Sequence, residues 1–120
     1  MILAFHPQFH HLITSGQKKC TIRRGHRWRI GASIQFYTGR YTSGARRKFH
    51  PDAKVFNVEN VEIMVASKTI IVNGQTLDPT QIESLAQKDG FPNTASFFEY
   101  FTKSLPKGTN NFTGQIIHWQ

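Results

Sequence analysis

The chain has 120 residues, of which 38% are hydrophobic and ten are phenylalanine, and its formal net charge is +8. This hydrophobic content is enough for one core and excludes a disordered chain, while the length is short for two domains. Because no apolar run approaches the roughly 18 residues that span a bilayer and no signal peptide is recognisable, we expect a single cytoplasmic domain over residues 1–120 without a membrane partner.

The first quarter of the chain predicts a short helix and then a strand. Apolar residues recur at helical spacing across residues 7–15, proline suits the first turn, and Gly16 lies where a helix stop belongs. Residues 18–23 follow as a strand. If the chain is extended from residue 19, alternation places two sets of side chains on opposite faces, namely Lys19, Thr21 and Arg23 against Cys20 and Ile22.

The middle of the chain is more irregular. Residues 24–30 are too basic and uneven to assign, and residues 33–38 alternate as a strand that Gly39 ends. Residues 40–53 are expected to form a mobile basic loop, since glycine and proline interrupt them.

The second half predicts two strands, two helices and a final strand. Residues 55–65 are rich in β-branched side chains, and residues 68–72 lead into a tight Asn-Gly turn. Asp78 and Pro79 start a helix that Gly90 stops. A second helix begins near Thr94 and carries phenylalanines at helical spacing, which we assign to the core, and residues 112–119 form the last strand. About five strands and three short helices indicate an α+β domain with a mostly antiparallel, curled sheet.

The positive charge is concentrated in the first half of the chain. Residues 1–54 hold eleven Lys or Arg against the single acid Asp52, giving +10, whereas the remainder has a charge of −2. A basic field of this kind attracts polyanions, so nucleic acid is the leading partner class, and a generally solvated basic surface is the alternative. Aromatic residues interleaved with the cations favour the first interpretation, because they can stack on exposed bases.

The order of these motifs resembles the ASCH domain family of the PUA-like superfamily. The pattern G-x-K-x-x-T-x-R is met by Gly16, Lys18, Thr21 and Arg23. The second half resembles a phage or prophage branch of the family through three further features, which are Tyr37-Thr38-Gly39, Leu85-Ala86-x-x-Asp89-Gly90-Phe91, and Phe112-x-Gly114-x-Ile116-Ile117-x-Trp119. The resemblance implies a PUA-like, small curled β-barrel of about five strands with about three flanking helices.

The resemblance also implies two functions. The first is binding of RNA or a nucleotide through a basic cleft, for which the candidate residues are Lys19, Arg23, Arg24, Arg27, Arg29, Tyr37, Arg40, Arg46, Arg47 and Lys48. The second is that of a related branch, the amidohydrolases of 4-acetylcytidine, which use a lysine, a threonine and a glutamate. The corresponding catalytic residues here are Lys18, Thr21 and Asp89, the last one carbon shorter than glutamate.

The hydrolytic chemistry makes a definite demand on the structure. Thr21 would be the nucleophile, Lys18 the base and Asp89 the proton shuttle, with Arg23 steering an anion or holding an oxyanion. In a regular strand, Lys18 and Thr21 would point to opposite faces. The hypothesis therefore requires Lys18 to lie in the turn, or at a bulge, before the strand.

Other side chains are assigned structural roles. Cys20, the single cysteine, excludes an internal disulfide and a cysteine-based zinc cluster, and we expect it to be a small buried residue. His6, His10 and His11 lack the spacing of a metal site, and no cofactor is expected. A phage protein that docks an acidic host protein through the basic region remains a further alternative.

Overall fold

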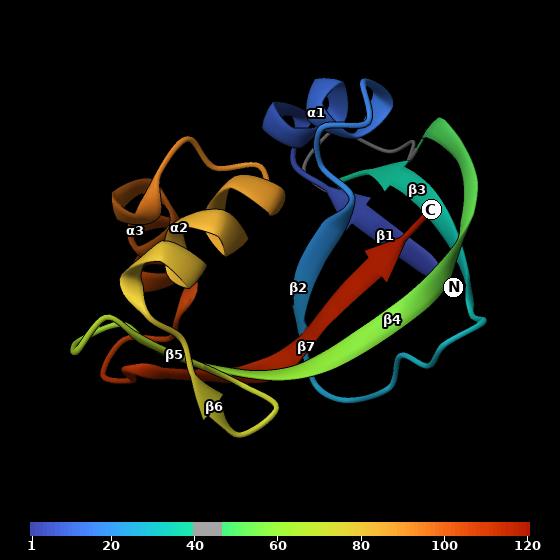
Figure 1. Ribbon diagram of the computed structural model, residues 1–120. Coiled ribbons are helices and arrows are strands. Elements are labelled where there is room, and N and C mark those ends of the chain that lie inside the picture. The colour runs from blue at the N-terminus through green and yellow to red at the C-terminus, as the bar shows by residue number, and fades with distance from the viewer. Residues whose placement is uncertain (40–46) are drawn as a thin grey trace.

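The computed structural model describes residues 1–39 and 47–120 (Figure 1). In chain order its elements are β1 (Ile2–Phe5), the 3-10 helix η1 (Pro7–Phe9), α1 (His10–Thr14), β2 (Cys20–Arg24), β3 (Ser33–Thr38), β4 (Lys48–Met64), β5 (Thr69–Val72), β6 (Gln75–Thr76), α2 (Pro79–Lys88), α3 (Thr94–Ser104) and β7 (Asn111–Trp119). The α+β class is confirmed. None of the helices in the described part of the chain is long and apolar enough to cross a membrane.

The sheet is organised around the long strand β4, which has 17 residues. Its N-terminal part pairs with β3, its C-terminal part pairs with β5, and β7 runs antiparallel along most of its length. β2 pairs antiparallel with β7, and β1 pairs parallel with β3. The prediction of a mostly antiparallel, curled sheet is therefore confirmed (Figure 1).

The predicted strand number was wrong, because the sheet formed by the described residues has seven strands and not about five. β1 and the two-residue β6 were missed, since each is too short to show alternation. The predicted loop over residues 40–53 was also wrong from residue 48 onward, where β4 begins, and its residues 40–46 lie outside the described part. Pro51 suggested a loop, but the β3–β4 ladder shifts register beside it, and irregular ladders tolerate proline.

Across the curled sheet the strands lie in the order β2, β7, β4, β3, β1. Backbone pairing does not close this sheet into a barrel. Among the described residues no ladder joins β1 to β2, so the predicted small curled β-barrel of about five strands is not confirmed. A side chain crosses this opening instead: the Arg23 guanidinium on β2 donates to the Ala4 carbonyl of β1 at 2.8 Å. The two edges of the curled sheet are thus held together at one point by an arginine.

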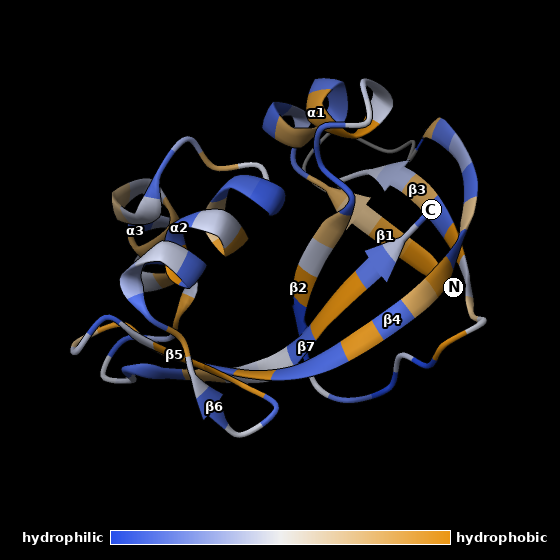
Figure 2. Ribbon diagram, viewed as in Figure 1, coloured by the Kyte–Doolittle hydropathy of each residue, from blue (hydrophilic) through white to orange (hydrophobic). Residues whose placement is uncertain are grey.

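Two aromatic clusters fill the core. One lies within the curled sheet and contains Phe5, Phe36, Phe49 and Trp119. The other joins the helices to β7 and contains Phe91, Phe97, Phe98, Phe101 and Phe112. Figure 2 shows the alternation of hydrophobic and hydrophilic residues along β4 and β7 that allows the sheet to form part of this core.

Candidate functional site

A cavity of about 390 Å³ lies where β1, β2, the end of α2 and α3 meet. Part of its wall is aromatic and is formed by Phe5, Phe9, Phe91, Tyr100 and Phe101. Another part is polar and is formed by Lys18, Thr21, Arg23 and Asp89. We call this space the Lys18 cavity. All three predicted catalytic residues line it, although they come from segments far apart in the sequence.

Lys18 reaches the cavity from an irregular segment that precedes β2. Gly16, with φ +81°, turns the chain at the end of α1, and the Lys18 amide donates to the Leu12 carbonyl at 2.8 Å. Because β2 begins only at Cys20, strand alternation does not fix the direction of Lys18. The condition that the hydrolytic hypothesis imposed on this residue is met.

Asp89 is held at the C-terminal end of α2. The helix starts with a capping box, in which Asp78 accepts from the Gln81 amide and the Gln81 side chain accepts from the Asp78 amide. It ends before Gly90, whose φ of +95° favours glycine. A Cβ on Gly90 would lie 3.2 Å from the Lys18 side chain, so glycine also leaves room for the lysine stem.

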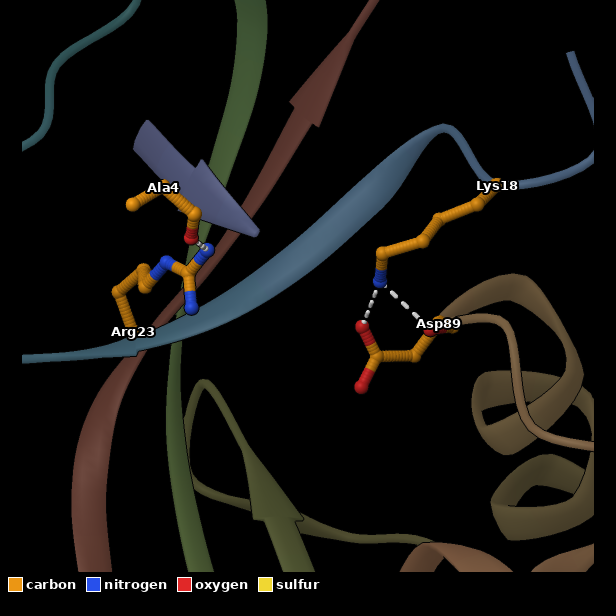
Figure 3. A network of polar contacts seen from close by, with 4 residues as sticks. All are labelled: Ala4, Lys18, Arg23 and Asp89. Carbon is orange, nitrogen blue, oxygen red and sulfur yellow. Dashed lines mark hydrogen bonds and ion pairs between the residues drawn. The ribbon is translucent and has the colours of Figure 1, made fainter. Parts of the chain in front are cut away.

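Lys18 and Asp89 form a buried ion pair. The ammonium donates to the carboxylate Oδ1 and to the backbone carbonyl of Asp89, each at 2.5 Å (Figure 3). The two side chains are only 2% and 6% exposed. The lysine thereby neutralises a carboxylate at a helix C-terminus, where the helix dipole disfavours negative charge, and it also satisfies a terminal carbonyl.

Burial changes the pKa of the Asp89 carboxyl. Desolvation raises the pKa of the Asp89 carboxyl above its ordinary value, while Lys18 and Arg23 offset part of the rise. The Lys18 ammonium also lies 5.0 Å from the centre of the Phe9 ring. Burial therefore favours the neutral form of the Asp89 carboxyl, whereas the two neighbouring cations favour its ionised form.

Thr21 lines the same cavity as this pair. The residue lies in β2, opposite Ile117 of β7, and is 4% exposed. In the described residues, every fully buried side-chain oxygen or nitrogen has a hydrogen-bond partner. The Thr21 hydroxyl has no partner among these residues, so it is not one of the fully buried atoms. The hydroxyl is therefore not fully enclosed, and the residue that carries it lines the cavity.

Arg23, two residues further along β2, has a different role. Its guanidinium bonds to Ala4, as Figure 3 shows. It also lies over the Phe5 ring at 4.8 Å. Burial lowers the pKa of Arg23, and Tyr100 and Asp89 oppose this shift. Arginine remains charged nonetheless, so the cavity holds a fixed cation.

The other predicted nucleic-acid contacts are not gathered around this cavity. Lys19 is exposed and lines a separate cavity, so the common face with Thr21 and Arg23 expected from alternation is not observed. The Arg24 guanidinium covers the Phe112 ring at 5.1 Å. Arg27 and Arg29 lie in the connection from β2 to β3, beyond the end of β2 that is distant from Lys18 (Figure 1).

Further candidates lie near the β3–β4 connection. Tyr37 is half-buried on β3, between Ala4 and Lys48 in the sheet. Lys48 forms an ion pair with Asp52, and the Arg47 amide donates to the Thr38 hydroxyl at 3.0 Å. Arg40 and Arg46 lie outside the described residues. Of the described members of the set, Arg23 lines the Lys18 cavity.

The sequence analysis missed the aromatic wall. Tyr100 lies on α3, is 37% exposed, and contacts Phe9 and Phe91 with ring centres 6.0 and 5.2 Å apart. Its place three residues after Phe97, at the edge of an apolar helix face, was a usable signal, because a tyrosine there presents a polar tip to solvent. Phe5 was missed because β1 was missed.

Cys20 is buried, as expected from the sequence. Burial raises the pKa of the Cys20 thiol to about 12, so the group stays protonated and is a poor nucleophile. The His10 ring stacks on Phe49, with centres 4.0 Å apart. Within residues 1–39 and 47–120, no cluster of three or more His, Cys, Asp or Glu is placed to hold a metal ion.

Comparison with solved structures identifies the fold. An ASCH protein from Zymomonas mobilis aligns with a TM-score of 0.55 and 18% sequence identity, covering 99% of this chain and 65% of that one. This chain therefore shares the ASCH fold. A variant of the Zymomonas protein in which one tyrosine is replaced by phenylalanine aligns with the same TM-score, 17% identity and coverage of 99% of this chain and 67% of that one.

At this level of sequence identity the similarity extends to the fold alone. This chain spans about two thirds of the length of the Zymomonas protein. No model of a known protein family matches the sequence, and no curated protein matches it either. The function must accordingly be argued from the site.

Proposed function

We propose that the Lys18 cavity binds a nucleoside, either free or as part of RNA. The observation that carries this proposal is the meeting of Lys18, Thr21 and Asp89 in one cavity that also has an aromatic wall. A volume of about 390 Å³ falls within the range of roughly 300–1,000 Å³ typical of small-molecule sites. Aromatic rings suit the faces of a nucleobase, and the polar groups suit its edge and its ribose.

Tyr100 provides the test of nucleoside binding. Loss of one stacking ring costs about 1–3 kcal/mol, so Tyr100→Ala is expected to weaken cytidine binding by roughly 5- to 150-fold. Isothermal titration calorimetry of cytidine measures this change. Tyr37→Ala is the matched control, because Tyr37 lies on β3 outside the cavity wall. Absence of cytidine and uridine binding to the unmodified protein would refute the proposal.

A second candidate function, hydrolysis of an acylated nucleoside such as 4-acetylcytidine, is favoured by the position of the Thr21 hydroxyl. Proton transfer from Lys18 to Asp89 would leave a neutral amine able to accept the hydroxyl proton. The Thr21 oxygen would attack the acetyl carbonyl, forming a carbon–oxygen bond. Collapse of the tetrahedral intermediate would break the carbon–nitrogen bond, with Lys18 returning a proton to the leaving amine.

Water would then complete the reaction. It would cleave the acetyl ester on Thr21, releasing acetate and restoring the hydroxyl. Arg23, which lines the cavity, would stabilise the negative oxygen that develops in both steps. Asp89 would hold the Lys18 proton between the two steps and so act as the proton shuttle.

Release of acetate from 4-acetylcytidine tests this candidate. Thr21→Val keeps the volume of the side chain and removes the nucleophile, so kcat is expected to fall by about 100-fold or more, whereas Thr21→Ser is expected to keep measurable activity. Thr113→Val, on the exposed side of β7, is the control for the loss of a strand hydroxyl. Full activity in Thr21→Val would exclude the mechanism and leave binding as the proposed function.

A further inference from the structure

A second cavity, of about 340 Å³, is lined in part by Gln17 and Lys19, the two chain neighbours of Lys18. The side chains that matter in it are Lys19, Phe56, Lys88 and His118. Lys19 belongs to the segment before β2, Phe56 to β4, Lys88 to the last turn of α2 and His118 to β7. We call this space the Lys19 groove.

The groove is cationic. Lys19 and Lys88 are both exposed, and no acidic side chain is among those that the structure places around the groove within the described residues. Glu59 lines an adjoining cavity together with Lys88 and His118, and its carboxylate lies 2.6 Å from His118 Nε2. Lys88 also interacts favourably with the dipole of α2, because it lies in the last turn of that helix. Its charge nevertheless stays at the protein surface.

Phe56 gives the groove an exposed aromatic face. Its side chain is 48% exposed, which is unusual for a large apolar residue in a strand of this chain. The cause is a shift in the β4–β7 ladder, where Val55 pairs with Trp119 but Asn57 pairs with His118. Phe56 is the additional residue at this bulge, and bulges redirect side chains. The Phe56 ring centre lies 6.0 Å from that of His118.

The groove and the Lys18 cavity are adjacent through the chain itself. Lys18 and Lys19 are consecutive residues. Lys18 lines the Lys18 cavity and Lys19 lines the Lys19 groove. Each space also combines cations with a partly exposed aromatic ring, Tyr100 in one and Phe56 in the other. Cations beside stacking rings are the combination with which proteins hold single-stranded nucleic acid.

We propose that the Lys19 groove binds single-stranded RNA, with Lys19 and Lys88 on its phosphates and Phe56 stacked on a base. The inference rests on the proposed function, since it extends a nucleoside in the Lys18 cavity to the adjoining nucleotides of a strand. It identifies the ligand class as an oligonucleotide in preference to a free nucleoside. The two lysines would suit either RNA or an acidic protein. We choose RNA because the exposed Phe56 ring can stack on a base.

The experiment compares two probes, cytidine and a short single-stranded oligocytidylate, on the same variants. Lys19→Gln/Lys88→Gln is expected to weaken oligocytidylate binding by about tenfold or more at low salt and to leave cytidine binding unchanged. The slope of log K against log salt should fall by about 0.7 for each lysine removed. Phe56→Ser should weaken oligocytidylate binding by roughly 5- to 150-fold with no change in the slope.

The control is Lys68→Gln/Lys107→Gln, which removes the same charge from exposed positions that do not line the groove. An oligocytidylate that binds no more tightly than cytidine would overturn the inference while leaving the proposed function intact. Equal losses in the control would also overturn it, because they would indicate a non-specific charge effect. Competition by polyglutamate as strong as that by oligocytidylate would assign the groove to an acidic protein instead. Failure of cytidine to bind is the distinct outcome that refutes the proposed function.

Discussion

Asp89→Ala is expected to lower the free energy of unfolding by about 3–5 kcal/mol at neutral pH, because it leaves the Lys18 ammonium buried without its partner. Both groups are almost fully enclosed, so solvent cannot replace the lost contacts. The Lys18 ammonium would keep only the backbone carbonyl at position 89. Urea denaturation followed by circular dichroism measures the change.

The double variant Lys18→Met/Asp89→Leu is the control for this result. It removes both charges and keeps apolar volume in their place, and such replacements are often neutral or stabilising. We therefore expect the double variant to be more stable than Asp89→Ala. If Asp89→Ala unfolds like the unmodified protein, the ion pair described here does not contribute to the folded state.

The same pair provides a second readout in the pH dependence of stability. Burial raises the pKa of Asp89 in the folded protein, so between the unfolded value of about 3.9 and the higher folded value the folded state binds more protons. Stability contributed by this group is complete below the unfolded pKa and is lost as the pH rises through the folded one. Relative to the double variant, the unmodified protein should become less stable as the pH is raised across that interval.

Gly114→Ala is expected to destabilise the protein by about 3 kcal/mol or more. A Cβ at this position would lie 2.1 Å from the Arg23 carbonyl oxygen and 3.0 Å from the Arg24 Cα. These are backbone atoms of the paired strand β2, so no side-chain rotation can relieve the contact. The β2–β7 ladder would have to separate, and this ladder positions both Thr21 and Arg23 in the Lys18 cavity.

Two controls separate this effect from others. Gly74→Ala has open space around the new Cβ but a φ of +81°, so it should cost only about 1–2 kcal/mol of backbone strain. Thr113→Ala changes an exposed neighbour on β7 and should alter stability by about 0.5 kcal/mol or less. Thermal unfolding of the three variants ranks them, and a Gly114→Ala protein as stable as Thr113→Ala would contradict the close approach of β2 to β7.

The Lys18–Asp89 pair also links stability to the proposed chemistry. A buried pair of this kind costs desolvation energy, which a hydrophobic pair would avoid. The Thr21 hydroxyl has no partner within the described residues. A buried ion pair with a desolvation cost and a residue whose hydroxyl has no partner there line the same cavity. This combination is expected of a functional site, where polar groups interact with a ligand.

The residues of the Lys18 cavity were predicted unequally well. Lys18, Thr21 and Asp89 were chosen through the family resemblance, and the structure brings them to one cavity. The aromatic wall was missed, because Phe5, Phe9 and Tyr100 approach the site only through the packing of β1, η1 and α3 around it. Lys19 was expected beside Thr21, but the regular alternation of β2 starts one residue later.

The sequence by itself determined the local elements of this protein. Asp78 and Pro79 begin α2, Gly90 ends it, and the phenylalanines of α3 share one buried face, because each of these features depends on residues within a few turns of one another. Only the tertiary structure decided that Lys18 meets Asp89, 71 residues away, and that Arg23 reaches Ala4 across the open edge of the sheet. The physical reason is that strand pairing and helix packing set such distances, and neither is encoded in the spacing of a motif.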